Sequence, residues 1–252
     1  MNAEAPPLTP APFGAATGFV IAVVLFVAWG LAQAMTLFWL DVDVAWGPLQ
    51  AALLLPLLTW LYTGLFITAH ESIHGLVWQG RPRLNRAVGR TMSALVAFLP
   101  YTLLEEGHHR HHDRLGHPED PDGAPHIDAG FVSWLMSFFG NYVRWPQVVG
   151  MALLFNVLVH GLHIPIENAV LAVILAPIGS ALQLFTFGTF LPHRAPPEGW
   201  SEDEIPARSV DLPTWLSLLT CFHFGLHREH HEWPSVPWWK LPEARRWARR
   251  RS

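Results

Sequence analysis

The chain has 252 residues, of which 51% are hydrophobic and only 14% are charged, and its mean hydropathy is +0.24. Soluble domains have about 25% charged residues, so this composition indicates an integral membrane protein. The single cysteine, Cys221, excludes an intramolecular disulfide and a Cys-x-x-Cys metal site. No nucleotide-binding glycine motif is present, and we expect no nucleic-acid partner. We expect one domain over residues 1–252, with a disordered tail at 1–14 and a basic cytosolic tail at 245–252.

Two uncharged runs near the N-terminus predict the first two membrane spans, at residues 18–40 and 49–69. Each is close to the roughly 20 residues that a helix needs to cross a bilayer. A short turn with Asp41, Asp43 and Gly47 separates them. The second run leads directly into His70 and His74, so we expect this helix to continue beyond the membrane surface.

The middle of the chain predicts shorter elements and then two more spans. The apolar run at 93–104 is too short to cross and contains Pro100, which favours a half-inserted or interfacial hairpin that returns to the side it left. The aromatic segment 131–145 is typical of an interfacial helix. Residues 148–164 and 169–191 predict the third and fourth spans, and 214–222 is a further short apolar piece. The expected fold is therefore all-α, with about four transmembrane helices, short interfacial helices and a histidine-rich cap.

The distribution of basic residues predicts the orientation in the membrane. None of the 16 lysines and arginines falls in the two short turns, at 41–48 and 165–168. Because loops rich in lysine and arginine stay in the cytoplasm, we expect both termini and all the histidine clusters on the cytosolic side of a bacterial inner membrane.

Ten of the 15 histidines form three clusters: His70 and His74, then the HHRHH box at 108–112, then HxxxHxxHH at 223–231. Side chains at i, i+3 and i+4 share one helix face, and imidazole is the commonest side-chain metal ligand. Eight or more convergent imidazoles exceed what one ion needs, so we predict two. Imidazole suits iron, and a binuclear iron site can activate O2. The predicted ligands are His70, His74, His108, His111, His112, His193, His227, His230 and His231.

Other residues are candidates for metal contact or for hydrogen bonds to the ligands. His193 ends the last span and is our ninth ligand, with His223 as the alternative. Metal-bound imidazoles usually donate their second N–H to a carboxylate or carbonyl. The candidates for such roles are His109, Glu71, Asp122 and Glu229, and more loosely Glu105, Glu106, Asp113, Asp120 and Glu232. We expect no metal role for His117 and His126, and we rank His160 and His163 well below the clusters.

The residues that flank the histidine clusters narrow the choice of protein family. Six features next to or within the histidine clusters are informative: Gly75 after HxxxH, Asp120-Pro121-Asp122 after the second box, FGTFLPHR at 187–194, HFG at 223–225, HREHH at 227–231 and PWWKLP at 237–242. Together they resemble the bacterial carotenoid ketolases that act on β-carotene at C4. The resemblance runs from about residue 66 to 242. Departures are Glu71 in place of aspartate, Gly107 in place of a basic residue, and His117-Pro118-Glu119 in the loop after the second box.

This resemblance implies the reaction. Two irons, reduced by an external donor protein such as ferredoxin, would activate O2 and hydroxylate C4 of a β-ionone ring twice. The geminal diol would lose water to give a ketone, with echinenone and canthaxanthin as products, or astaxanthin from a hydroxylated precursor. Two alternatives stay open at this point: a fatty-acyl desaturase or hydroxylase with the same metal site, and a histidine-rich metal transporter.

Overall fold

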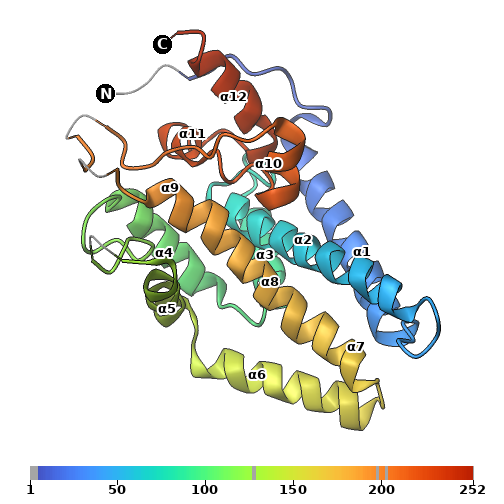
Figure 1. Ribbon diagram of the computed structural model, residues 1–252. Coiled ribbons are helices and arrows are strands. Elements are labelled where there is room, and N and C mark those ends of the chain that lie inside the picture. The colour runs from blue at the N-terminus through green and yellow to red at the C-terminus, as the bar shows by residue number, and fades with distance from the viewer. Residues whose placement is uncertain (1–4, 127–128, 197–198, 202–203, 252) are drawn as a thin grey trace.

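The computed structural model describes residues 5–126, 129–196, 199–201 and 204–251, and these residues form helices without any strand (Figure 1). After a short turn, η1 (Gly14–Ala16), come α1 (Thr17–Phe38) and α2 (Gly47–Ile73). A third long helix is composite; its parts are α7 (Ile166–Val170), η3 (Leu171–Leu175), α8 (Ala176–Leu184), η4 (Phe185–Phe190) and α9 (Leu191–His193). All three are long and apolar enough to cross a membrane. The prediction of an all-α, multi-pass membrane protein is confirmed.

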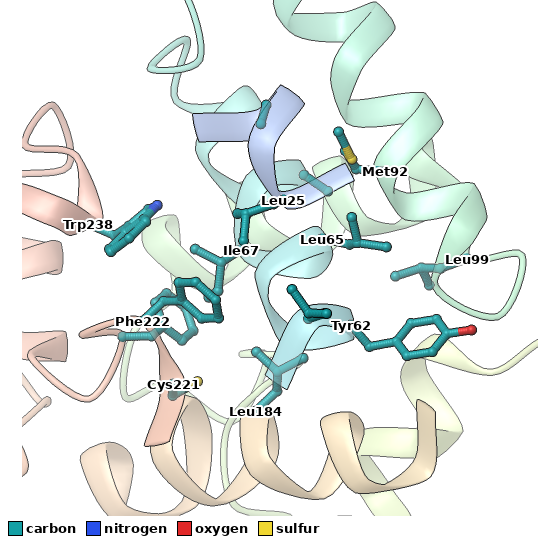
Figure 2. Packing of buried hydrophobic residues seen from close by; sticks show 14 of the residues in the cluster. Leu25, Tyr62, Leu65, Ile67, Met92, Leu99, Leu184, Cys221, Phe222 and Trp238 are labelled. Atoms are coloured by element: carbon teal, nitrogen blue, oxygen red, sulfur yellow. The ribbon is translucent and has the colours of Figure 1, made fainter. Parts of the chain in front are cut away.

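Helix α2 is the centre of the bundle. Its residues Leu58, Leu65 and Ile67 are fully buried. Figure 2 shows Leu65 and Ile67 among side chains of the neighbouring helices, including Leu25 of α1 and Leu184 of α8. The outer face of α1 is apolar as well, since Val24, Leu31 and Phe38 are exposed, among others. Such a large exposed apolar surface suits contact with lipid rather than water.

The predicted span at 148–164 differs from the observed helix. Helix α6 (Trp145–Asn156) continues as η2 (Val157–Gly161), and the pair is bent by 89° from α5 (Phe131–Tyr142). Only α5 and α6 together pass as a fourth span, so the described residues contain three spans, or four if this bent pair crosses. The bend occurs at Val143 and Arg144, whose backbones are extended, just before Pro146. Proline cannot donate the backbone hydrogen bond that would continue α5.

The predicted hairpin at 93–104 is a break between two helices. Helix α3 (Pro82–Leu95) packs against α2, and α4 (Tyr101–Asp113) follows after a five-residue turn. Ala97 and Phe98 in this turn have positive φ angles of 51° and 56°, a conformation that ends a right-handed helix.

The C-terminal helices form a cap over one end of the bundle. The cap comprises α10 (Thr214–Cys221), α11 (His227–Glu232), η5 (Trp238–Lys240) and α12 (Leu241–Ala248), and it lies at the end where α9 finishes (Figure 1). The turns before α2 and α7 lie at the other end. Residues 1–4 of the predicted tail and Ser252 lie outside the described residues. Residues 5–13 carry no helix, but the Thr9 amide donates to Glu243 Oε1 of α12 at 2.7 Å.

Candidate metal centre

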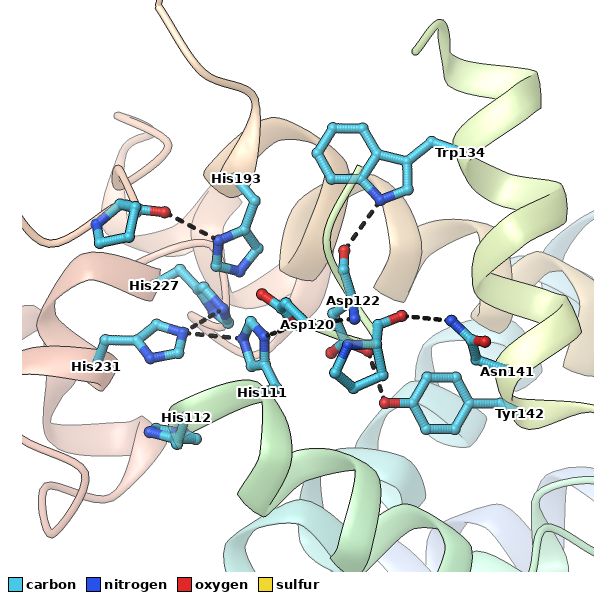
Figure 3. A network of polar contacts seen from close by, with 12 residues as sticks. His111, His112, Asp120, Asp122, Trp134, Asn141, Tyr142, His193, His227 and His231 are labelled. Carbon is cyan, nitrogen blue, oxygen red and sulfur yellow. Dashed lines mark hydrogen bonds and ion pairs between the residues drawn. The ribbon is translucent and has the colours of Figure 1, made fainter. Parts of the chain in front are cut away.

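Four helices bring the histidines together beneath the cap. Helix α2 continues beyond its apolar stretch to carry His70, and His74 caps its C-terminus, as the sequence predicts. The HHRHH box lies in α4, His193 ends α9, and the last cluster opens α11. Figure 3 shows side chains from α4, α9 and α11 pointing toward one another.

The histidines form two groups of four. The first group is His70, His74, His108 and His230, and the second group is His111, His193, His227 and His231. Within each group the candidate ligand nitrogens all lie within 4.8 Å of one another. The two groups are adjacent, since the ring centres of His230 and His231 are 5.4 Å apart.

Helical phase explains the division. In α11, His227 and His231 are four residues apart, so they share a face and enter the second group, while His230 turns toward the first. Helix α4 divides in the same way, giving His108 to the first group and His111 to the second. Helices α4 and α11 therefore lie between the two groups and serve both. Helix α2 serves only the first group, and α9 only the second.

The nitrogens are spaced as ligands to a shared ion would be. In the first group the Nε2 atoms of His74 and His108 are 2.7 Å apart. In the second, Nε2 of His231 lies 3.1 Å from that of His111 and 3.0 Å from that of His227. Two nitrogens bound at about 2.1 Å with ordinary bond angles would be separated by about 3 Å. The buried Nε2 atoms of His70 and His193 have no hydrogen-bond partner in the protein. Coordination to a metal ion would satisfy both atoms.

Burial keeps most of these imidazoles neutral, the form that binds metal. Desolvation lowers the pKa of His74 to about 4 and that of His112 to about 3. It lowers the pKa of His108 and of the three α11 histidines well below the usual range. His111 differs: burial lowers its pKa, but the Asp122 and Asp120 carboxylates outweigh this and leave it raised.

The remaining predicted histidines lie outside the two groups. His112 Nε2 is 3.1 Å from Nε2 of His230, and its ring lies 4.4 Å from that of His231, so it sits between the groups. His223 is buried, but its Nδ1 is 3.1 Å from Ser217 Oγ and it is in neither group. His109 is exposed, as are four other histidines: His117, His126, His160 and His163.

The predicted carboxylates separate into several roles. Asp120 Oδ1 lies 2.8 Å from His111 Nδ1, and both side chains are almost fully buried. This contact holds the proton on Nδ1 and aims Nε2 at the second group. Glu71 Oε1 is 3.4 Å from His70 Nδ1, without hydrogen-bond geometry, and its Oε2 accepts from the Trp238 amide. Glu229 pairs instead with Arg245 at 2.8 Å and accepts from the Ser209 hydroxyl.

Asp122 also belongs to the site, through the cavity beside it. Its Oδ1 accepts a hydrogen bond of 2.6 Å from the Tyr142 hydroxyl, and burial raises its pKa. Of the other acidic residues, Glu105 pairs with Arg86 at 3.2 Å. Glu106 and Asp113 are exposed, and Glu232 is half-buried.

The sequence does not predict the hydrogen bond that orients His193. Its Nδ1 lies 3.2 Å from the carbonyl oxygen of Pro206, in a stretch between α9 and α10 that contains no recognisable motif. Because backbone carbonyls occur at every residue, no sequence signal marks the one that will meet a given imidazole.

A cavity of about 160 Å³ borders both histidine groups. His70 and His108 of the first group and His111 and His227 of the second line it. The remaining wall is mostly apolar and comes from α2, the α3–α4 turn, α5 and α8; it includes Phe66, Val96, Leu99, Phe138, Phe139, Ala181 and Leu184. An apolar molecule placed here would lie against both groups at once.

The amino-acid sequence is similar to those of several known proteins. The sequence model of the fatty acid desaturase family matches residues 44–150 and 139–252. A Paracoccus protein named beta-carotene ketolase is 42% identical over 233 residues, which is 91% of each chain. A Haematococcus lacustris beta-carotene ketolase is 37% identical over 79% of this chain and 63% of that protein. A Chlamydomonas reinhardtii zeaxanthin 4-ketolase is 38% identical over 76% of this chain and 43% of that protein.

Proposed function

We propose that the chain is a β-carotene 4-ketolase. This proposal starts from the family of the chain, which belongs to the fatty acid desaturase family and, within that family, to the β-carotene ketolases. As a member it is an oxidoreductase. The proposed reaction is the O2-dependent oxidation of C4 of a β-ionone ring to a ketone, giving echinenone and canthaxanthin, or astaxanthin from a hydroxylated ring. The observation that carries this proposal is that two four-histidine groups border one apolar cavity.

The two groups fit two iron ions. The first group would hold one iron and the second group the other, and iron bound there would supply the activation of O2 with electrons from a donor protein such as ferredoxin. The nitrogen spacing, the neutral imidazoles and the two unpartnered Nε2 atoms support this assignment. His112, between the groups, is a further candidate ligand at either of them.

The protein's own residues hold and orient the substrate. The aromatic and aliphatic walls would pack on a flat ring and exclude water from it. Phe66 and Ala181 line the cavity and belong to helices that are long and apolar enough to cross a membrane, which favours uptake of a carotenoid from the bilayer. Asp120 and the Pro206 carbonyl fix the orientation of His111 and His193.

The function is tested by expressing the chain in bacteria that make β-carotene. We expect ketocarotenoids in the pigment extract and about two irons per purified chain. The variants His111→Ala and His230→Ala, one from each group, should give neither ketone nor full iron. A wild-type chain that holds iron and leaves β-carotene unchanged would overturn the proposal, and an altered fatty-acid profile would then favour a fatty-acyl desaturase or hydroxylase.

We also propose that the cap and both termini face the cytosol of a bacterial inner membrane. The two turns at the end away from the cap contain no lysine or arginine, which supports this orientation. Reporter fusions at the C-terminus test it: a fluorescent protein should be active there and a periplasmic phosphatase inactive. The convergence of the histidines at one end of the bundle favours metal that stays bound over metal that is transported.

A further inference from the structure

The substrate cavity has one carboxylate in its wall. Apart from the histidines, its polar lining residues are Asp122, Tyr142, Gln147 and Thr189. Gln147 is already engaged, since its Oε1 accepts from the Arg144 amide at 2.7 Å. Placing a carboxylate beside an apolar cavity costs free energy unless the carboxylate is hydrogen-bonded. The position of Asp122 therefore calls for a functional explanation.

Asp122 is held firmly in place. The Tyr142 hydroxyl donates to its Oδ1 at 2.6 Å, and its backbone amide donates to Asp120 Oδ1 at 2.9 Å. Its carbonyl oxygen accepts from Trp134 Nε1 at 3.0 Å (Figure 3). Helix α5, through Tyr142 and Trp134, thus fixes the carboxylate on the cavity wall.

The same network places this carboxylate beside the second histidine group. Asp120, which positions the Asp122 amide, also binds His111 at 2.8 Å. His111 and Asp122 both line the cavity. A ring carbon presented to the second group therefore has its substituents near Asp122.

Ketone formation creates a need for such a group. After the first oxidation the ring carries a hydroxyl, and an alcohol in an apolar cavity is destabilised unless it has a hydrogen-bond partner. A carboxylate has about four lone-pair positions, so Asp122 retains accepting capacity after it binds Tyr142. One relative, the Chlamydomonas reinhardtii zeaxanthin 4-ketolase, is named for a substrate whose rings already carry a hydroxyl.

We propose that the Asp122–Tyr142 pair is the binding site for a hydroxyl group on the substrate ring. The ring hydroxyl would donate to the Asp122 carboxylate, which Tyr142 holds in orientation. This inference rests on the proposed function. It assigns the pair to the hydroxylated ring and not to the bare one, whether the hydroxyl is the one formed at C4 or one already present at C3.

The test compares Tyr142→Phe and Asp122→Asn with wild-type protein carrying its metal. Three substrates are supplied separately in detergent micelles with a reductant: β-carotene, 4-hydroxy-β-carotene and zeaxanthin. Tyr101→Phe is the matched control, because that buried hydroxyl contacts Ser72 at 3.1 Å and lies outside the cavity lining. Iron content is measured for every variant.

We expect both pair variants to keep their iron and to lose more kcat/KM on a hydroxylated ring than on β-carotene, so that the ratio of the two kcat/KM values falls. Their kcat/KM for a hydroxylated ring should fall about tenfold or more, as loss of a hydrogen bond to a charged group predicts. The 4-hydroxy intermediate should then accumulate relative to ketone. A loss confined to 4-hydroxy-β-carotene assigns the pair to the C4 hydroxyl, and a loss confined to zeaxanthin assigns it to C3.

Two results would overturn this inference: equal loss on bare and hydroxylated rings with iron intact, or wild-type kinetics on all three substrates in both variants. If Asp122→Asn fails to fold or loses iron, Tyr142→Phe decides alone, because it leaves the contact between Asp120 and His111 in place. A wild-type chain that oxidises none of the three substrates would refute the proposed function itself, which is a separate outcome.

Discussion

Removing the Asp120 carboxylate should weaken metal binding at one histidine group only. Asp120 is the buried partner of His111 Nδ1, at 2.8 Å, and it contacts no other histidine by a hydrogen bond among the described residues. His111 belongs to the second group. Without the carboxylate, the imidazole loses the contact that fixes its proton on Nδ1 and its ring plane.

The magnitude follows from this single contact. Replacing a hydrogen-bond partner of a metal-bound histidine typically lowers metal affinity by about 10–100-fold, which is about 1.4–2.8 kcal/mol. Asp120→Asn keeps the size and an accepting oxygen, so it should fall near the lower value. Asp120→Ala should approach the upper value, because it also leaves the partly buried amide of Asp122 without its acceptor.

The assay is iron content after dialysis against increasing concentrations of a chelator. Wild-type protein should release its irons at high chelator, whereas Asp120→Ala should fall to about one iron per chain at a concentration that leaves the wild type loaded. Asp113→Asn is the control, since this carboxylate lies in α4, the helix that carries His111, but is exposed. Equal iron retention by Asp120→Ala and wild type, or loss of both irons together, would refute the division into two groups.

Three further predictions concern the site. His193→Ala should remove iron and activity, whereas His223→Ala should keep both by metal analysis and pigment assay, because only His193 joins the second group. Gly107→Ala should lower stability by about 1–3 kcal/mol in detergent unfolding, because its Cβ would lie 2.8 Å from the Tyr142 hydroxyl. Metal-free protein should unfold more easily as the pH falls from about 6.5 to 4. In this range a histidine in the unfolded chain binds a proton, whereas folded His74 does not, because burial lowers its pKa to about 4. A melting temperature that stays constant across this range would contradict the prediction.

The helices and the histidine boxes were predictable because their signals are local. Apolar runs of about 20 residues identify α1, α2 and the composite helix that ends at His193. The i, i+4 spacing within each cluster places His70 with His74, and His227 with His231, on common faces. These are properties of a single helix, so they hold whatever the helix packs against.

The division of the histidines was not predictable, because it depends on how helices far apart in the chain pack. His193 meets His227, with ring centres 4.7 Å apart, only after the cap folds back over α9. Neither segment contains a sequence signal that predicts this contact. The cavity has the same origin: its wall joins α2, α4, α5 and α8, which are far apart in the chain.

The departure at Gly107 connects the packing of α4 to the substrate. The resemblance leads us to expect a basic residue here, yet a Cβ at this position would lie 2.8–2.9 Å from atoms of Tyr142. A long basic side chain would displace that ring from its present position. Because Tyr142 holds Asp122 on the cavity wall, the absence of a side chain at 107 allows the arrangement that we assign to the ring hydroxyl. Substrate preference in this chain should therefore respond to position 107, although Gly107 itself does not line the cavity.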